Sequence, residues 1–178
     1  INTLLLLIEQ TKQSSPADAL KYGHQLHKLA KQLGCTERII DALTGITRAY
    51  IDLGYYDSAL IACQKAIHMS DSIDDLRRLA KNYANYGYLT FLPGNTEKAY
   101  LYYKKSYNIH TDLNDSTIGR AEALNGIAVM LMQLSKLDSA VYYYLELIKL
   151  CEIKQYEVIL GKAYNNLGIV YESNQEFE

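Results

Sequence analysis

The chain has 178 residues, with 18 basic against 20 acidic side chains and hydrophobic residues making up 49% of the total. It contains no block of like charge, which argues against nucleic acid and against an anionic membrane as partners. Its longest apolar run, Leu4 to Ile8, is far shorter than the roughly 20 residues of a membrane span and lacks the features of a signal peptide.

Helix signals follow one another along the whole chain. Only Pro16 and Pro93 interrupt it, and Ser15 before Pro16 is typical of a helix N-cap followed by proline in the first turn. Three glycines suit the left-handed residue that closes a helix: Gly34, Gly54 and Gly94. These signals and the apolar spacing predict helices over residues 2–12, 16–32, 36–53, 56–70, 74–92, 96–111, 116–134, 138–152 and 156–174.

Several residue types recur at a spacing of 40 or 41. One column is alanine, at Ala19, Ala59, Ala99 and Ala140. A second column is large and apolar, at Leu43, Tyr83, Leu124 and Tyr164. A third, four residues further on, is small, at Thr47, Gly87, Ala128 and Gly168. Such a period is typical of stacked repeats, in which neighbouring units complete one continuous core.

The predicted fold class is therefore all-α, an α-α superhelix or solenoid of antiparallel helix pairs with about four and a half repeats. We expect a single domain over 1–178, with units near 1–35, 36–73, 74–114, 115–155 and a partial unit over 156–178. A half unit would leave an apolar face uncovered, whereas solenoids normally end in a polar cap. We therefore expect the chain to be a fragment of a longer protein.

The columns also carry a resemblance to a known family. The stretch from Leu43 through Tyr50, Gly54 and Ala59 to Ala66 resembles a tetratricopeptide repeat (TPR) with leucine in the usual tryptophan position. The units that contain Tyr83 and Tyr164 resemble it again, and the resemblance covers nearly the whole chain. The period of 40 alone lies nearer the HEAT and armadillo range, but the glycine, tyrosine and alanine columns favour an elongated TPR, as found in sensory segments of bacterial signalling proteins.

In that family the first helix of each unit lines a concave groove that binds a peptide or protein. The resemblance places the groove residues of this chain at Thr44, Arg48, Lys81, Asn85, Tyr88, Asn125, Met132, Lys162, Asn165 and Asn166. Asparagine amides both donate and accept hydrogen bonds, which matches an extended peptide backbone. The alternative is that these asparagines are solvated or bridge neighbouring helices. The family's carboxylate clamp is incomplete, because Glu122 and Gly126 stand where a cation would be needed.

Other conspicuous residues have structural explanations. The 17 tyrosines favour packing over ligand stacking. His24 and His27 have a spacing that would allow metal binding, but no third ligand lies near them in sequence, so packed or surface histidines are the preferred interpretation. The cysteines Cys35, Cys63 and Cys151 have neither zinc spacing nor a disulfide pattern. We expect no cofactor and no metal.

The resulting expectation is a binding module and not an enzyme, because no catalytic motif is visible. Its partner would be a protein or peptide, including an effector domain of its own, in a signalling or transcription-regulatory protein. The alternative is a homo-oligomerisation module that dimerises through its open C-terminal end while the groove stays empty. The cytoplasm is favoured, and a periplasmic location would require an upstream signal peptide.

Overall fold

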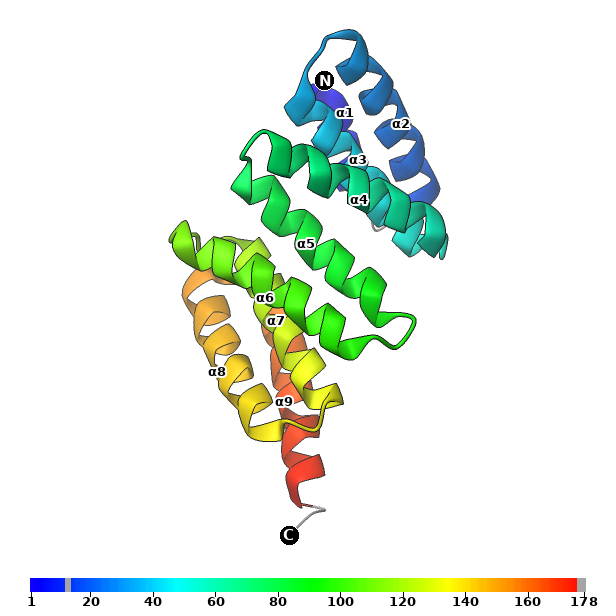
Figure 1. Ribbon diagram of the computed structural model, residues 1–178. Helices are drawn as coiled ribbons and strands as arrows, with labels where there is room; N and C mark the ends of the chain where they lie inside the picture. The colour runs from blue at the N-terminus through cyan, green and yellow to red at the C-terminus, as the bar shows by residue number, and fades with distance from the viewer. Residues whose placement is uncertain (12–13, 176–178) are drawn as a thin grey trace. The chain divides into compact units, whose positions relative to one another are not determined.

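The chain is all-helical, as predicted. A computed structural model describes residues 1–11 and 14–175, which form nine α-helices and no strand (Figure 1). The helices are α1 (Asn2–Thr11), α2 (Pro16–Gln32), α3 (Thr36–Asp52), α4 (Tyr56–Ser72), α5 (Leu76–Phe91), α6 (Thr96–Asp112), α7 (Ile118–Gln133), α8 (Leu137–Lys154) and α9 (Glu157–Gln175). Each predicted helix is present with ends that differ by at most a few residues. The expected partial unit, 156–178, runs past the described part at residues 176–178.

The helices fall into two compact units, Ile1–Leu89 and Thr90–Glu178, which we describe separately. In the first unit α1 packs on α2, α2 on α3 and α3 on α4. Short turns join these helices, so that successive helices run antiparallel (Figure 1). The core forms where apolar stripes meet, as at Ile8, Leu26 and Ala42 and at Ile40, Leu43 and Ala66.

The second unit repeats this arrangement, with contacts from α6 to α7, α7 to α8, α8 to α9 and α7 to α9. One continuous core joins α7, α8 and α9 around the fully buried Tyr144 and includes Leu124, Leu147 and Val170. The alanine column is buried in both units, since Ala19, Ala59, Ala99 and Ala140 are at most 1% exposed. Small side chains at these positions allow close helix approach, which is why the alanine column recurs.

The turns that follow α2 to α8 share one backbone conformation. Seven residues at intervals of 20 or 21 have a positive φ, namely Gly34, Gly54, Asp74, Gly94, Asn114, Ser135 and Gln155. After each, the next N–H bonds a carbonyl five residues earlier, as Tyr55 does with Tyr50 at 2.8 Å and Lys136 with Leu131 at 2.9 Å. This pattern satisfies the carbonyls that a helix end leaves without partners. The three glycines of this set were predicted from sequence, whereas the other four positions were not.

The N-cap predicted at Ser15 is present, and a second N-cap lies at Asn95. The Ser15 hydroxyl accepts a hydrogen bond from the N–H of Asp18, and Pro16 occupies the first turn of α2. The Asn95 side chain accepts from the N–H of Lys98 at the start of α6.

None of the helices in the described ranges 1–11 and 14–175 combines the length and the apolar character that a bilayer span requires.

Candidate functional site

The predicted groove residue Thr44 is not part of an open surface. It is 7% exposed, and its hydroxyl donates to the Asn82 Oδ1 on α5 at 3.0 Å and lies 2.9 Å from the carbonyl of Ile40. Asn82 is fully buried and donates through Nδ2 to the backbone carbonyl of Arg78, while the backbone carbonyl of Asn82 accepts from the Cys63 thiol. Thr44 therefore joins α3 to α5 and leaves no hydroxyl for a ligand, so we remove it from the candidate surface.

An ion-pair network lies one turn before these residues on the same two helices. Arg78 of α5 donates to Asp41 of α3 through Nε at 2.8 Å and through a second guanidinium nitrogen at 3.1 Å. Arg78 also pairs with Asp75, and Arg38 donates to Asp41 at 3.0 Å. Hydrogen bonds to Asp41 raise the pKa of Arg78 further above its ordinary value, more than burial lowers it. The network holds the N-terminal ends of α3 and α5 together, and the Asp41 carboxylate is fully engaged by the two arginines.

Four predicted residues of the first unit remain at the surface or near it. Arg48 is exposed and pairs with Asp52 of its own helix, at 3.3 Å. Lys81 and Tyr88 are exposed on α5, and Asn85 between them is half-buried. Because these residues follow one another at helical spacing, Lys81, Asn85 and Tyr88 share one face of α5. We call this triplet the α5 surface; it offers a cation, an amide and an aromatic ring.

In the second unit, two of the predicted asparagines point inward. Asn125 of α7 is half-buried, and its Oδ1 is fully buried and has no hydrogen-bond partner among residues 1–11 and 14–175. Burial raises the pKa of the Tyr144 hydroxyl to about 12, and the nearby Asn166 amide opposes this rise. Among the described residues the Tyr144 hydroxyl makes no hydrogen bond, although the Asn166 amide lies close enough to affect its pKa. Asn166 therefore faces Tyr144 of α8 and is not fully available to a ligand.

Lys162 and Asn165 of α9 are exposed, and Met132 of α7 is half-buried. Together with exposed Glu122 they give this surface both signs of charge. Neither unit presents a patch of one sign here, so charge alone selects no acidic or basic partner. Of the ten predicted site residues, the structure leaves the α5 surface, Arg48, Lys162 and Asn165 as the accessible set.

A polar cluster that the sequence did not predict joins α6, α7 and α8. The Tyr107 hydroxyl donates to Glu146 at 2.8 Å, and Arg120 donates to the same carboxylate oxygen at 3.2 Å. Lys104 donates to the Tyr143 hydroxyl at 2.6 Å and lies 5.0 Å from the ring centres of Tyr107 and Tyr143. The only available signal was an approximate one, since residues 104 and 143, and 107 and 146, lie 39 residues apart, close to the repeat length of 40 or 41. These contacts join neighbouring helices and give Tyr107 and Tyr143 a structural role.

A buried histidine–aspartate pair closes the turn between α6 and α7. His110 Nδ1 lies 3.3 Å from Asp115 Oδ2, and the other carboxylate oxygen of Asp115 accepts the N–H of Thr117 at 2.9 Å. Burial alone would raise the pKa of Asp115, but hydrogen bonds from Thr117 and His110 outweigh it and hold that pKa below its usual range. The pair fixes the turn that starts α7.

The remaining candidates for chemistry are engaged in packing. The His24 ring makes an edge contact with Tyr50, with ring centres 6.3 Å apart. Burial raises the pKa of the Cys63 thiol to about 12 and also raises that of Cys151, so both thiols stay protonated. Across the described part of the chain, no three His, Cys, Asp or Glu side chains come together as a metal site would require.

Comparison with known proteins identifies the fold. No protein-family model matches the chain, and no curated protein sequence matches it. Among solved structures, a Rap protein complexed with Competence and Sporulation Factor is similar with a TM-score of 0.82 and 17% identity, over 97% of this chain and 52% of that one. BtubC from P. vanneervenii is similar with a TM-score of 0.75 and 19% identity, over 90% and 67%.

A third similar structure is a kinesin light chain from Podosopora anserina with nearly identical TPR-like repeats, with a TM-score of 0.74 and 11% identity over 98% of this chain and 87% of that one. These likenesses, together with the helix pairs and the buried alanine column, confirm a TPR-like helical repeat fold. The chain spans about half of the Rap protein and two thirds of BtubC.

Proposed function

We propose that this chain is a protein-binding module that takes a polypeptide segment on the exposed faces of its first helices. The observation that carries the proposal is the α5 surface, where Lys81, Asn85 and Tyr88 lie on one face of a first helix. The neighbouring residues Thr44 and Asp41, by contrast, form hydrogen bonds within the fold. A tyrosine ring with an amide beside it combines apolar area and backbone-matching hydrogen bonds. Lys162 and Asn165 of α9 offer similar groups in the second unit.

The role we propose is binding without catalysis. One support is that Arg78 is held in ion pairs with Asp41 and Asp75. Another is that the thiols of Cys63 and Cys151 are buried. The similarity to a Rap protein complexed with Competence and Sporulation Factor is a likeness of fold, and it supports a regulatory or signalling setting only as an analogy. In that setting the bound segment would bias an effector domain.

A selection experiment tests the binding function. The chain is used to enrich peptides from a phage-displayed library of random dodecamers, and the affinity of one enriched peptide is measured by calorimetry. For a peptide bound at the α5 surface, Tyr88→Ala combined with Asn85→Ala should weaken the affinity more than tenfold, as expected for loss of an aromatic anchor. Gln64→Ala, an exposed change on the second helix α4, is the control. Failure to enrich any peptide, or equal weakening by the control, would refute the proposal.

The alternative function is self-assembly with no groove ligand. The observation that favours it is apolar exposure on the second unit, where Val158 of α9 and Ile153 of α8 are 75% and 67% exposed. Sedimentation equilibrium over a wide concentration range distinguishes the two functions. A dimer that persists when Tyr88 and Asn165 are both replaced would support assembly, and a monomer at all concentrations would exclude it.

A further inference from the structure

The outward side of α6 and α8 carries apolar side chains that solvent reaches. Leu101 of α6 is 57% exposed, and Tyr142 and Leu145 of α8 are 64% and 51% exposed. On the same two helices Ala99 and Leu147 are fully buried, so the exposed residues lie opposite the face that packs on α7. A single exposed leucine needs no explanation, whereas neighbouring exposed apolar residues indicate a contact surface.

Side-chain contacts show that these residues are neighbours across the two helices. Lys104 of α6 donates to the Tyr143 hydroxyl of α8 at 2.6 Å, and the Tyr143 ring meets the Tyr142 ring edge-on with centres 5.3 Å apart. Leu101 lies one turn before Lys104, and Leu145 lies one turn after Tyr142. The three exposed apolar residues therefore lie on both sides of one contact between α6 and α8 and form a single apolar patch.

Lys104 is a half-buried cation that forms no ion pair with any carboxylate of the described residues. Its ammonium donates to the Tyr143 hydroxyl and lies 5.0 Å from the ring centres of Tyr107 and Tyr143. The Glu146 carboxylate of α8 accepts instead from Tyr107 and Arg120. An ammonium has three donors, and the Tyr143 oxygen, which accepts from Lys104, keeps its own O–H to donate. The two groups therefore offer a positive charge and hydrogen-bond donors that an anionic group would satisfy.

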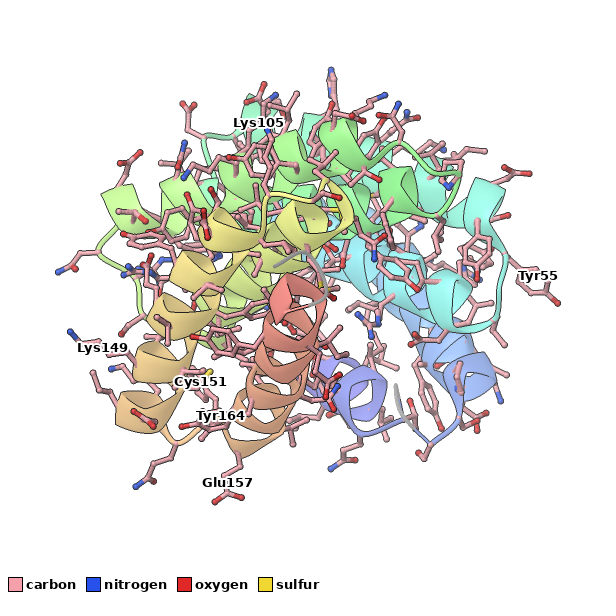
Figure 2. All side chains as sticks on the ribbon, turned by 90° about the horizontal axis from the view of Figure 1, so that it is seen from below. Tyr55, Lys105, Lys149, Cys151, Glu157 and Tyr164 are labelled. Carbon is pink, nitrogen blue, oxygen red and sulfur yellow. The ribbon has the colours of Figure 1, made fainter. Side chains whose placement is uncertain are left out.

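The charges of α6 and α8 are distributed by position along the helices. Lys105 of α6 lies 5.0 Å from the Tyr102 ring centre, and Lys149 lies one turn after Leu145. Both lysines are exposed and point away from their helices (Figure 2). Apart from Glu146, the acidic residues lie in the first or last turns of the two helices: Glu97, Asp112, Asp138 and Glu152. The middle is therefore positive, and we call the following residues the outer surface: Leu101, Lys104, Lys105, Tyr142, Leu145 and Lys149.

We propose that the outer surface binds an acidic amphipathic segment of a partner protein. Apolar side chains of the segment cover the three exposed apolar residues, and one of its carboxylates accepts hydrogen bonds from Lys104 and Tyr143. Charge complementarity selects this occupant, because a short segment over the middle of the surface meets lysines and no free carboxylate. A flat anionic membrane would also meet the acidic residues at both ends of α6 and α8. The inference goes beyond the proposed function, which concerns first helices, because it adds a separate surface on second helices.

The test selects peptides that depend on the outer surface. Phage-displayed random dodecamers are enriched on the full chain after removal of those that bind a double variant, Leu101→Ser with Lys149→Glu. The surviving peptides should be rich in Asp and Glu beside apolar residues, and the affinity of one of them is measured by calorimetry. Lys149→Glu alone should weaken it at least tenfold, as should Tyr142→Ala. Lys28→Glu, which changes an exposed lysine at the same repeat position of α2, is the matched control and should leave the affinity unchanged.

The same selection separates this inference from the proposed function. Peptides that the double variant still binds do not need the outer surface and are the ones that test the α5 surface, whereas Tyr88→Ala should not affect the surviving peptides. The inference is overturned if no peptide survives the removal step, if the survivors are not acidic, or if Lys149→Glu and Lys28→Glu act equally. It is also overturned if Lys149→Glu instead abolishes cosedimentation with phosphatidylserine vesicles or formation of a dimer, because lipid or a second copy then occupies the surface.

Discussion

Arg78 and Asp41 lie 37 residues apart, yet the guanidinium of Arg78 donates two hydrogen bonds to the Asp41 carboxylate, at 2.8 and 3.1 Å. The contact joins two first helices, α3 and α5, at a surface that sequence reasoning assigned to ligand binding. Both side chains are only 20–25% exposed, so solvent screens the pair less than it screens a surface ion pair. The charged side chains Arg78 and Asp41 therefore stabilise the packing of α3 and α5, which limits their availability to a ligand.

Replacing Arg78 should measurably destabilise the chain. Arg78→Ala leaves the half-buried carboxylate of Asp75 without its cation and leaves Asp41 with Arg38 alone, and we expect a loss of about 1–3 kcal/mol in the free energy of unfolding. Urea denaturation followed by circular dichroism measures it. Arg48→Ala removes an exposed pair and should cost less than about 1 kcal/mol. Equal losses for the two variants would show that the Arg78 network contributes no more to stability than an exposed ion pair does.

The chain should lose stability in acid. Burial alone would raise the pKa of Asp75, but hydrogen bonds from Arg78 outweigh it, and the pKa is lowered, as it is for Asp115. A carboxyl with a lowered folded-state pKa stabilises the fold above the unfolded value of about 3.8, and this contribution disappears as pH falls through the folded pKa. Melting temperature measured from pH 6 downward should fall most steeply below about pH 4.

A single substitution checks the origin of that slope. Asp115→Asn should give a lower melting temperature at neutral pH and a shallower decrease in acid, because one of the two shifted carboxyls no longer titrates. Asp71→Asn changes an exposed carboxyl of α4 and should leave the pH profile as it is. A profile that keeps its full slope without Asp115 would exclude this carboxyl as a source of the acid sensitivity.

The helical glycines Gly126 and Gly161 predict opposite effects of alanine. Gly126→Ala would place its Cβ 2.3 Å from the Tyr103 ring, and we expect a cost of about 1–3 kcal/mol from overpacking. Gly161→Ala meets nothing within 4 Å and should stabilise α9 by up to about 1 kcal/mol through helix propensity. Thermal melts of both variants provide the comparison, and destabilisation by the Gly161 change would contradict the open environment of that residue.

The left-handed turn residues offer a way to stabilise the chain. Ser135 and Gln155 have φ values of 56° and 58°, a conformation that is strained for residues with a side chain. Ser135→Gly should raise the free energy of unfolding by roughly 0.5–1 kcal/mol, whereas Gly54→Ala at the matching position with φ 78° should lower it by a similar amount. Chemical denaturation distinguishes the two signs, and a loss of stability in the Ser135 variant would refute the strain argument.

The sequence predicts the helices and the repeat more fully than it predicts the site. Alanine and large apolar columns are direct consequences of helix packing, so Ala59 or Leu124 could be assigned to the core from spacing alone. Thr44 was misplaced because a threonine at the edge of the apolar stripe gives no sign of whether it meets water or an amide such as Asn82. The pairing of Arg78 with Asp41 depends on how α3 and α5 are offset relative to each other. The apolar periodicity of a single helix gives no information about that offset.

The four non-glycine turn residues show a related limit. Asp74, Asn114, Ser135 and Gln155 occupy the same left-handed position as the glycines, but only the 20-residue interval identifies them. A residue-by-residue search for glycine finds three of the seven turns. The interval itself was visible in the sequence as half of the 40-residue period, and it would have located the remaining turns.

The central claim is that exposed faces of the first helices bind a polypeptide, and nuclear magnetic resonance titration with a library-selected peptide tests it most directly. The largest shift changes are expected at exposed residues of a first helix, either Lys81, Asn85 and Tyr88 of α5 or Lys162 and Asn165 of α9. Shift changes confined to the second helices, for example around Tyr142 and Lys149 of α8, would contradict it.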